Sequence, residues 1–214
     1  MEHIIAVLIG WFLGLSSNLI LSWFYMINEI LDFIDGIICE LDNVLVHLVN
    51  YKLSIDKLTG SFGLPSLFWT IDIYNNIPRG LINESNLDEI GRLLDLDEGI
   101  EVFNNNVNVS KNILFNIKIP YIVNNMSKIA KLSSQAQLIF FRIIDGIQFL
   151  NDKITKYAPD QKRSGQSLTN SQIIFLNSIS KECEELSWLI INFKTIINNF
   201  LPKKFINNLK CFLC

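Results

Sequence analysis

The chain opens with a long uncharged apolar run. Residues 4–28 carry no charged side chain. About 20 apolar residues in a helix cross the hydrocarbon core of a bilayer, so the run predicts one transmembrane helix. The residues before it include no Lys or Arg, and Trp23, Phe24 and Tyr25 stand where a cleavage site needs small residues, which argues against a secretory signal peptide. A core helix of a soluble bundle is the alternative interpretation.

Three apolar stripes with helical spacing follow the run. Gly60, Gly63 and Pro65 are expected to end the first helix, and Thr169 or Ser171 is expected to cap the third. The polar stretch 160–167 predicts a turn, so the last two helices are expected to form an antiparallel hairpin. The stripes are Ile27, Leu31, Ile34, Ile38, Leu41, Leu45 and Leu48; Ile129, Leu132, Ala136, Ile139, Ile143, Gly146 and Leu150; and Leu176, Ile179, Cys183, Leu186, Ile190, Phe193, Ile197 and Phe200.

These stripes predict an all-α fold in which a single N-terminal transmembrane helix continues into an antiparallel helical bundle. The expected organisation is an anchor over residues 1–28, a cytosolic bundle over 29–201 and a basic tail containing cysteine over 202–214. Between the stripes, residues 87–103 predict a short acidic helix, and prolines interrupt the aromatic segment 62–77. Residues 107–119 are expected to form a helix or a packed loop, because a lone strand would lack a partner.

Charge is divided between the two halves of the chain. Residues 27–101 carry 14 acidic and 4 basic side chains, and residues 102–214 carry 6 acidic and 14 basic ones, within a net charge of −3. The halves are expected to neutralise each other, inside one bundle or between subunits. The alternative is that the basic half faces anionic lipid. Its clusters, Lys162-Arg163 and Lys203-Lys204, are only pairs, so nucleic acid is not an expected partner.

Residues able to carry out catalysis are sparse. His3 and His47 are the only histidines, and no zinc-protease, P-loop or dinucleotide-binding motif occurs. The cysteines lack zinc-site spacing, and Cys39 and Cys183 fall on apolar helical faces, which predicts small core residues in a reducing compartment. We therefore expect no catalytic residues, no metal site and no cofactor, and a function that is not enzymatic.

Small and polar residues share one stripe of the predicted anchor. Gly10 and Gly14 form a GxxxG pattern, and Ser17 and Asn18 extend it by one turn. Such a stripe lets two membrane helices approach closely, and an amide near the middle of a bilayer needs a partner. The stripe therefore predicts self-association, or a pore lining if more than four helices assemble. Contact with lipid or with another protein is the alternative.

The end of the chain is basic and apolar. Lys203, Lys204 and Lys210 are candidates for contact with anionic lipid or a protein partner. Cys211 and Cys214 are candidates for lipidation, although a terminal cysteine does not fit the usual prenylation signal. A packed or frayed end is the alternative.

The layout resembles that of small bacterial membrane effectors, including those of antiphage systems, in which one membrane helix precedes an oligomerising helical bundle. The resemblance implies an oligomeric membrane protein that forms a pore or perturbs the bilayer, with its C-terminal domain in the cytoplasm. A second hypothesis is a membrane tether or scaffold that recruits a protein partner through its bundle. A third, based on the tail alone, is a lipid-modified effector delivered into a host cell.

Overall fold

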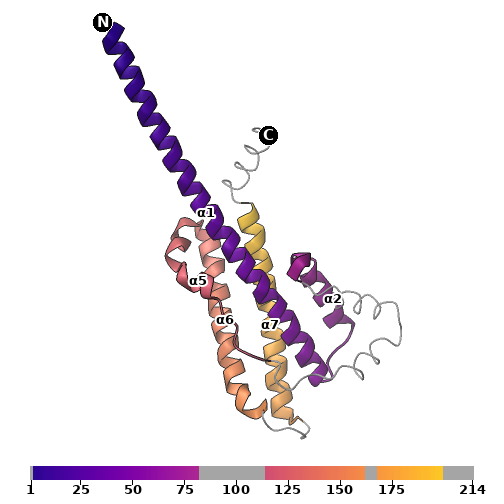
Figure 1. Ribbon diagram of the computed structural model, residues 1–214. Coiled ribbons are helices and arrows are strands. Elements are labelled where there is room, and N and C mark those ends of the chain that lie inside the picture. Colours follow the sequence, from indigo (N-terminus) through magenta and orange to yellow (C-terminus); the bar gives the residue numbers. More distant parts are fainter. Residues whose placement is uncertain (1, 82–113, 162–167, 200–214) are drawn as a thin grey trace.

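The computed structural model describes residues 2–81, 114–161 and 168–199, without the side chains of residues 2–9, 79 and 157–161. Helices are the only regular elements in these ranges, which confirms the expected all-α class (Figure 1). Apart from turns, the remaining described residues are loop. The elements are α1 (Glu2–Leu58), α2 (Leu64–Tyr74), the 3₁₀ helix η1 (Arg79–Leu81), α5 (Pro120–Asn124), the 3₁₀ helix η2 (Met126–Lys131), α6 (Ser134–Gln161) and α7 (Asn170–Asn198).

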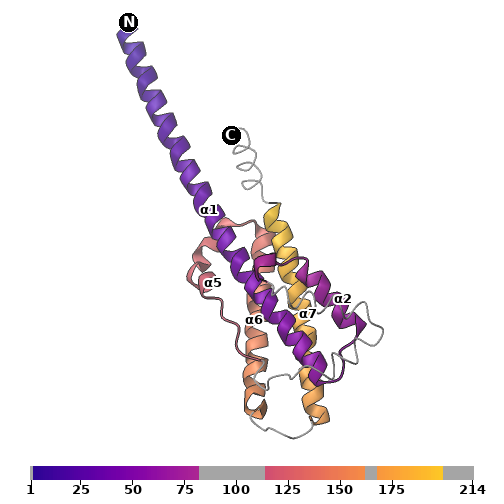
Figure 2. The same cartoon turned by 45° about the vertical axis from the view of Figure 1, so that its right-hand side comes forward.

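Helix α1 is continuous over 57 residues and has two environments. Its second half packs in the bundle, whereas its first half extends beyond every other described element (Figures 1 and 2). The helix ends as predicted, because Gly60 adopts a φ of +70°. The Ser61 amide donates to the Asp56 carbonyl and the Gly60 amide to the Lys57 carbonyl, which is the Schellman arrangement that a glycine at this position allows.

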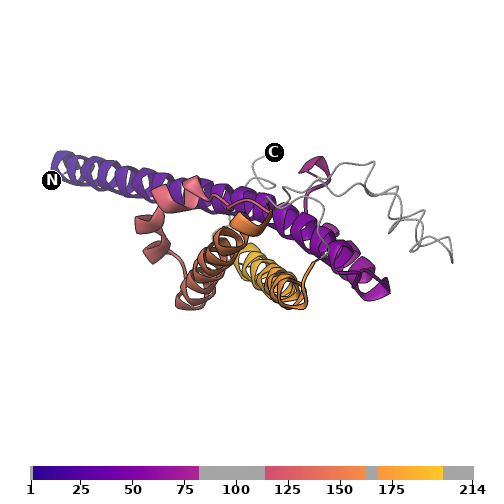
Figure 3. The same cartoon turned by 90° about the horizontal axis from the view of Figure 1, so that it is seen from below.

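The bundle core is formed by α1, α6 and α7. Helix α7 packs against both of the others, and α6 and α7 run antiparallel on one side of α1 (Figure 3). This confirms the predicted hairpin. The third stripe is buried at each of its described positions, and the capping box between Thr169 and Gln172 confirms the predicted start of α7. Phe200 and Pro202 lie outside the described residues.

The structure corrects some local expectations. Ile129 of the second stripe lies in η2, before α6 begins at Ser134, and α6 includes residues 160 and 161 of the predicted turn. Pro65 starts α2 instead of interrupting a segment, because a proline is tolerated in the first turn of a helix. Cys183 is buried as expected, but Cys39 is exposed, so its assignment to the core was wrong.

The segment 114–124 joins α1 to α6. From α1, the Tyr51 hydroxyl donates to the Phe115 carbonyl at 2.5 Å. From α6, the Asn151 side chain accepts from the Ile117 amide at 2.7 Å and donates to the Ile117 carbonyl at 2.9 Å. Ile117 itself is buried, so the expectation of a packed loop is confirmed for residues 114–119. Residues 107–113 and the predicted helix 87–103 lie outside the described residues.

Ion pairs connect the acidic and basic halves of the chain. Lys194 of α7 donates to the buried Asp42 carboxylate of α1 and to the Asn76 carbonyl at 2.5 Å. Glu29 of α1 lies 3.4 Å from Lys128 and 3.2 Å from Lys131. At these positions the two halves neutralise each other within one chain, as one of the two interpretations predicted.

Candidate membrane and association surface

The first half of α1 exposes a continuous apolar surface, which we call the projecting surface and define as residues 10–26. Apolar side chains are exposed on all sides of the helix here, and Trp11 and Tyr25 reach 66% and 73% exposure. Burial against the bundle begins at Ile27. Apolar surface of this extent on a folded chain indicates an interaction with another protein or with lipid. Its large exposed members are Trp11, Phe12, Leu13, Leu15, Leu19, Ile20, Leu21, Trp23, Tyr25 and Met26.

The four residues predicted to mediate association lie on one stripe of this surface. A Cβ atom built on Gly10 or Gly14 would meet nothing within 4 Å, so the stripe is open on the single chain. The Ser17 hydroxyl donates to the Gly14 carbonyl at 2.9 Å, so it is satisfied within its own helix. Asn18 is exposed, and its side-chain amide forms no hydrogen bond with another described residue. The stripe is thus free to accept a second helix.

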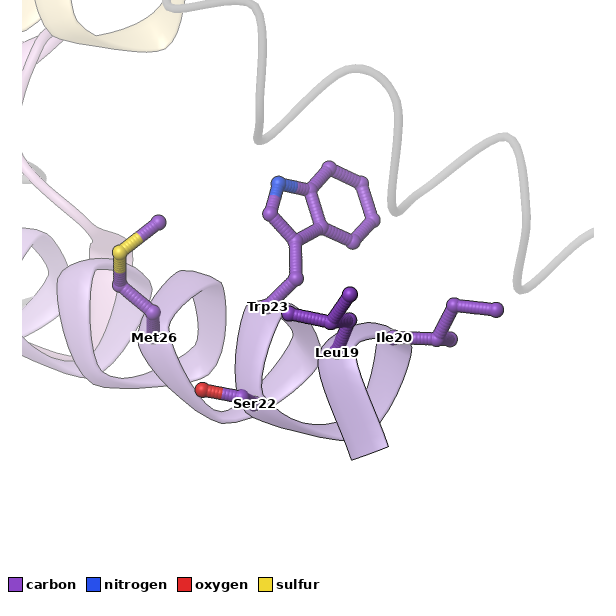
Figure 4. Close-up of a pocket in the computed structure, with 5 residues that line it drawn as sticks. All are labelled: Leu19, Ile20, Ser22, Trp23 and Met26. Atoms are coloured by element: carbon purple, nitrogen blue, oxygen red, sulfur yellow. The ribbon is translucent and has the colours of Figure 1, made fainter. Parts of the chain in front are cut away.

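A shallow hollow lies at the base of the projecting surface (Figure 4). Its described lining comes from α1 alone, with the Trp23 ring and the Met26 side chain on the same side of the helix. One helix cannot enclose a ligand, so the hollow is a surface feature and not a binding pocket. Leu19, Ile20 and Met26 were not predicted as part of a site, although their helical spacing places them together. The lining residues are Leu19, Ile20, Ser22, Trp23 and Met26.

A buried polar cluster connects three helices inside the bundle. Lys52 of α1 lies 3.0 Å from the Asp56 carboxylate, one turn later, and 3.6 Å from Glu184 of α7. Asp56 also accepts hydrogen bonds from Ser66 of α2 at 2.7 Å and from Ser180 of α7 at 2.6 Å. Each of these hydroxyls is directed at the same carboxylate, so the cluster fixes the relative positions of α1, α2 and α7.

Two other features border this cluster. The Lys52 ammonium lies 5.4 Å from the centre of the Trp69 ring, within cation–π range. The indole Nε1 of Trp69 is buried and has no hydrogen-bond partner among the described residues. Burial raises the pKa of Cys183, the strongest effect on this thiol, so it remains protonated.

Among the described residues, no group of three or more His, Cys, Asp or Glu side chains could hold a metal ion.

An aromatic cluster surrounds the second histidine. The His47 ring stacks on the Tyr51 ring, with 6.2 Å between the ring centres. It packs edge to face with the Phe115 ring, with 5.1 Å between the ring centres. Burial lowers the pKa of His47, because the ring loses water that would stabilise its charged form. Burial likewise raises the pKa of Tyr51 to about 12. These rings therefore act as neutral packing groups between α1 and the segment 114–119.

Two further predictions concern the membrane span and the basic tail. In the described part of the chain, no helix has the combined length and apolar character needed to cross a membrane. Lys203, Lys204, Lys210, Cys211 and Cys214 lie outside the described residues. The association stripe is thus the one predicted site whose geometry the structure gives.

The chain matches no family model, no curated protein and no solved structure.

Proposed function

We propose that this chain is a membrane-anchored helical protein, not an enzyme, that self-associates through the first half of α1 and permeabilises or perturbs its membrane. Such an activity is typical of the bacterial effectors, including antiphage effectors, that the layout resembles. The proposed location is the membrane, with the bundle on the cytoplasmic side. The proposed partners are the lipid bilayer and further copies of the same chain.

One observation carries the proposal: α1 is uncharged over residues 4–28 and exposed over residues 10–26, whereas its second half packs in the bundle. Residues 4–28 lack a charge, and the exposed apolar side chains of residues 10–26 surround the helix. An amphipathic helix that docks on a protein has one apolar face, whereas a helix in lipid is apolar all round. The exposure around the whole circumference therefore favours lipid over a single protein groove.

The stripe formed by Gly10, Gly14, Ser17 and Asn18 supports self-association. Close approach at the two glycines allows backbones to pack, and the Asn18 amide gains a hydrogen bond from the same amide of a second copy. In lipid the lone amide has no water to bond, so pairing is favoured over isolation. A ring of such helices would place its polar stripe inward, which is how the same residues would line a pore.

The first test separates membrane insertion from peripheral binding. The full chain is expressed, membranes are collected and extracted at alkaline pH, and the pellet and supernatant are probed for the protein. Retention in the pellet is the expected result, and release into the supernatant would overturn the anchor. The mass of the detergent-purified protein then gives the oligomer, and a monomer would overturn self-association.

A membrane tether is the second candidate, and a row of exposed apolar side chains on α6 favours it. Leu138 and Phe149 lie within about 20° of each other on this helix, with Phe141 beside them, and all three are exposed. Apolar residues gathered on one helix face are the typical docking surface for a protein partner. Replacing Leu138 and Phe149 with Ser is expected to abolish recruitment by a tether, and to leave membrane leakage unchanged if the pore proposal is correct.

A further inference from the structure

We propose that the segment 120–131, which contains α5 and η2, is a second membrane contact. In this proposal Met126 inserts among the lipid headgroups, and Lys128 and Lys131 bind the phosphates of anionic lipids. The inference rests on the membrane anchoring proposed above and names a lipid class that the bundle itself would recognise. It uses none of the residues of the basic tail.

The position of the segment along α1 carries the argument. Both lysines contact Glu29, at 3.4 and 3.2 Å, and Glu29 is the first charged residue after the uncharged run that ends at Asn28. If the run lies in lipid, Glu29 marks the boundary with water. The two ammonium groups then lie at the depth of the headgroups. Figures 1 and 2 show the segment with α5 beside the first part of the packed half of α1.

The segment also combines apolar and basic side chains. Val123 is 61% exposed and Met126 is 38% exposed. Exposed apolar residues beside cations are typical of segments that lie in the interface of a membrane. The side chains of Lys128 and Lys131 are 36% and 39% exposed, so both remain partly open to solvent beside Glu29.

The backbone below these side chains is fixed. Glu40 of α1 accepts hydrogen bonds from the Tyr121 amide at 2.9 Å and from the Ile122 amide at 2.7 Å. Ile122 and Ile129 are buried in the core at either side of the exposed positions. The exposed residues are therefore presented by a rigid support, so binding costs little conformational entropy.

The two lysines share one carboxylate partner. Glu29 forms the ion pairs with both of them among the described residues, while the Glu40 carboxylate accepts from two backbone amides, so each ammonium can also bind a lipid phosphate. A cytoplasmic leaflet carries negative lipids that attract such a charge within about one Debye length. Lipid is favoured over a protein partner here because the segment borders the uncharged run directly.

The test reports the environment of residue 126 in the full chain. Cys39, Cys211 and Cys214 are changed to Ser, and the buried Cys183 is kept. Met126→Cys then carries an environment-sensitive fluorophore. The matched control is Ile174→Cys, which is 71% exposed and lies in the first turns of α7, a helix that begins at the opposite end of the bundle (Figure 1). Both proteins are reconstituted into vesicles of phosphatidylcholine, with and without 30% phosphatidylserine.

The label at position 126 is expected to shift its emission to shorter wavelength, and to shift at least twice as far with phosphatidylserine. The label at 174 is expected to report water in both vesicles. Lys128→Gln with Lys131→Gln should remove the phosphatidylserine increment, whereas Glu29→Gln should enlarge it by freeing both lysines. A purely structural ion pair would respond to neither lipid, and Glu29→Gln would then leave the emission unchanged.

Two failures are distinguishable. If the labelled chain does not float with the vesicles after alkaline extraction, the proposed anchor fails and this inference fails with it. If the chain floats but positions 126 and 174 report the same environment, the anchor stands and the second contact is overturned. Circular dichroism of each variant confirms that its helix content matches that of the unaltered chain.

Discussion

The ring of Tyr121 lies directly against the backbone of α1 at Gly36. A methyl group built on Gly36 would lie 2.2 Å from the ring carbon Cζ, well inside any contact distance. The Tyr121 hydroxyl donates to the Asp32 carbonyl one turn earlier at 3.3 Å. The absence of a side chain at Gly36 therefore allows α5 to dock on α1, and with it the segment proposed to contact lipid.

Gly36→Ala is expected to lower the free energy of unfolding by about 1 to 3 kcal/mol, because the overlap forces the ring and its backbone to move. Alanine would otherwise stabilise a helix by about 0.5 to 1 kcal/mol. In a Tyr121→Ala background the same change should be neutral or stabilising. Denaturation of the four proteins in detergent, followed by circular dichroism, completes the cycle, and equal losses in both backgrounds would contradict the contact.

Asp56→Asn is expected to destabilise the bundle by about 3 to 5 kcal/mol, since it breaks a buried ion pair and leaves Lys52 with the more distant Glu184. The matched control is Glu185→Gln, which removes the other i, i+4 pair at a site where the side chains of Lys181 and Glu185 are 77% and 60% exposed. That change should cost less than about 1 kcal/mol. Comparable losses in the two variants, measured by chemical denaturation, would show that the cluster has no special role.

His47 is expected to make the bundle less stable as the pH falls from about 7. Burial lowers the folded-state pKa of His47 below its ordinary value of 6.5, so the unfolded chain takes up the proton first. Proton uptake by the unfolded state favours unfolding, and the loss continues until the pH reaches the folded-state pKa. Below that value the contribution is constant.

His47→Phe keeps a ring against Tyr51 and Phe115 and removes the titration. Unfolding free energies measured between pH 5 and 7.5 should therefore fall less steeply in this variant than in the unaltered chain. Asp42 has the opposite effect, because burial raises its pKa, and it is present in both proteins. Parallel curves for the two proteins would mean that His47 is as accessible to protons when folded as when unfolded.

Gly14→Leu with Asn18→Leu is expected to preserve membrane insertion and to reduce the oligomer mass and any dye leakage from vesicles. The first change blocks close approach of two helices, and the second removes an interhelical amide bond worth about 0.6 to 2 kcal/mol at each contact. The matched control exchanges sizes on the opposite face, Phe12→Leu with Leu19→Phe, and should leave mass and leakage unchanged. A double variant with the original mass and leakage would favour the tether.

The sequence predicted the long-range organisation better than the close contacts. Periodicity alone located the buried faces of α6 and α7, because Ile139, Ile143 and Ile190 recur at helical spacing. Gly60 and Thr169 marked helix ends, since their chemistry is local. Gly36 gave no such signal, as its role depends on Tyr121, which is 85 residues away in the sequence.

The same difference separates candidate sites that lie within one helix from those formed by distant segments. A stripe such as Gly10 and Gly14 is visible at a spacing of four, because one helix creates it. The pairing of Glu29 with Lys128 and Lys131 depends on how a short segment returns to α1, and no residue near either partner in the sequence specifies that return. Cys39 shows the converse error, since an apolar neighbourhood in the sequence placed an exposed thiol in the core.

Because α1 has no break between its two halves, it acts mechanically as one stiff rod. Its 57 residues span about 85 Å. If the projecting half tilts by about 10°, the far end of the packed half is displaced by roughly 8 Å, since that half is about 45 Å long. In the proposed membrane-anchored oligomer, a change in bilayer thickness or in the angle between neighbouring copies would therefore be transmitted to the α2 end of the bundle without any intermediate hinge.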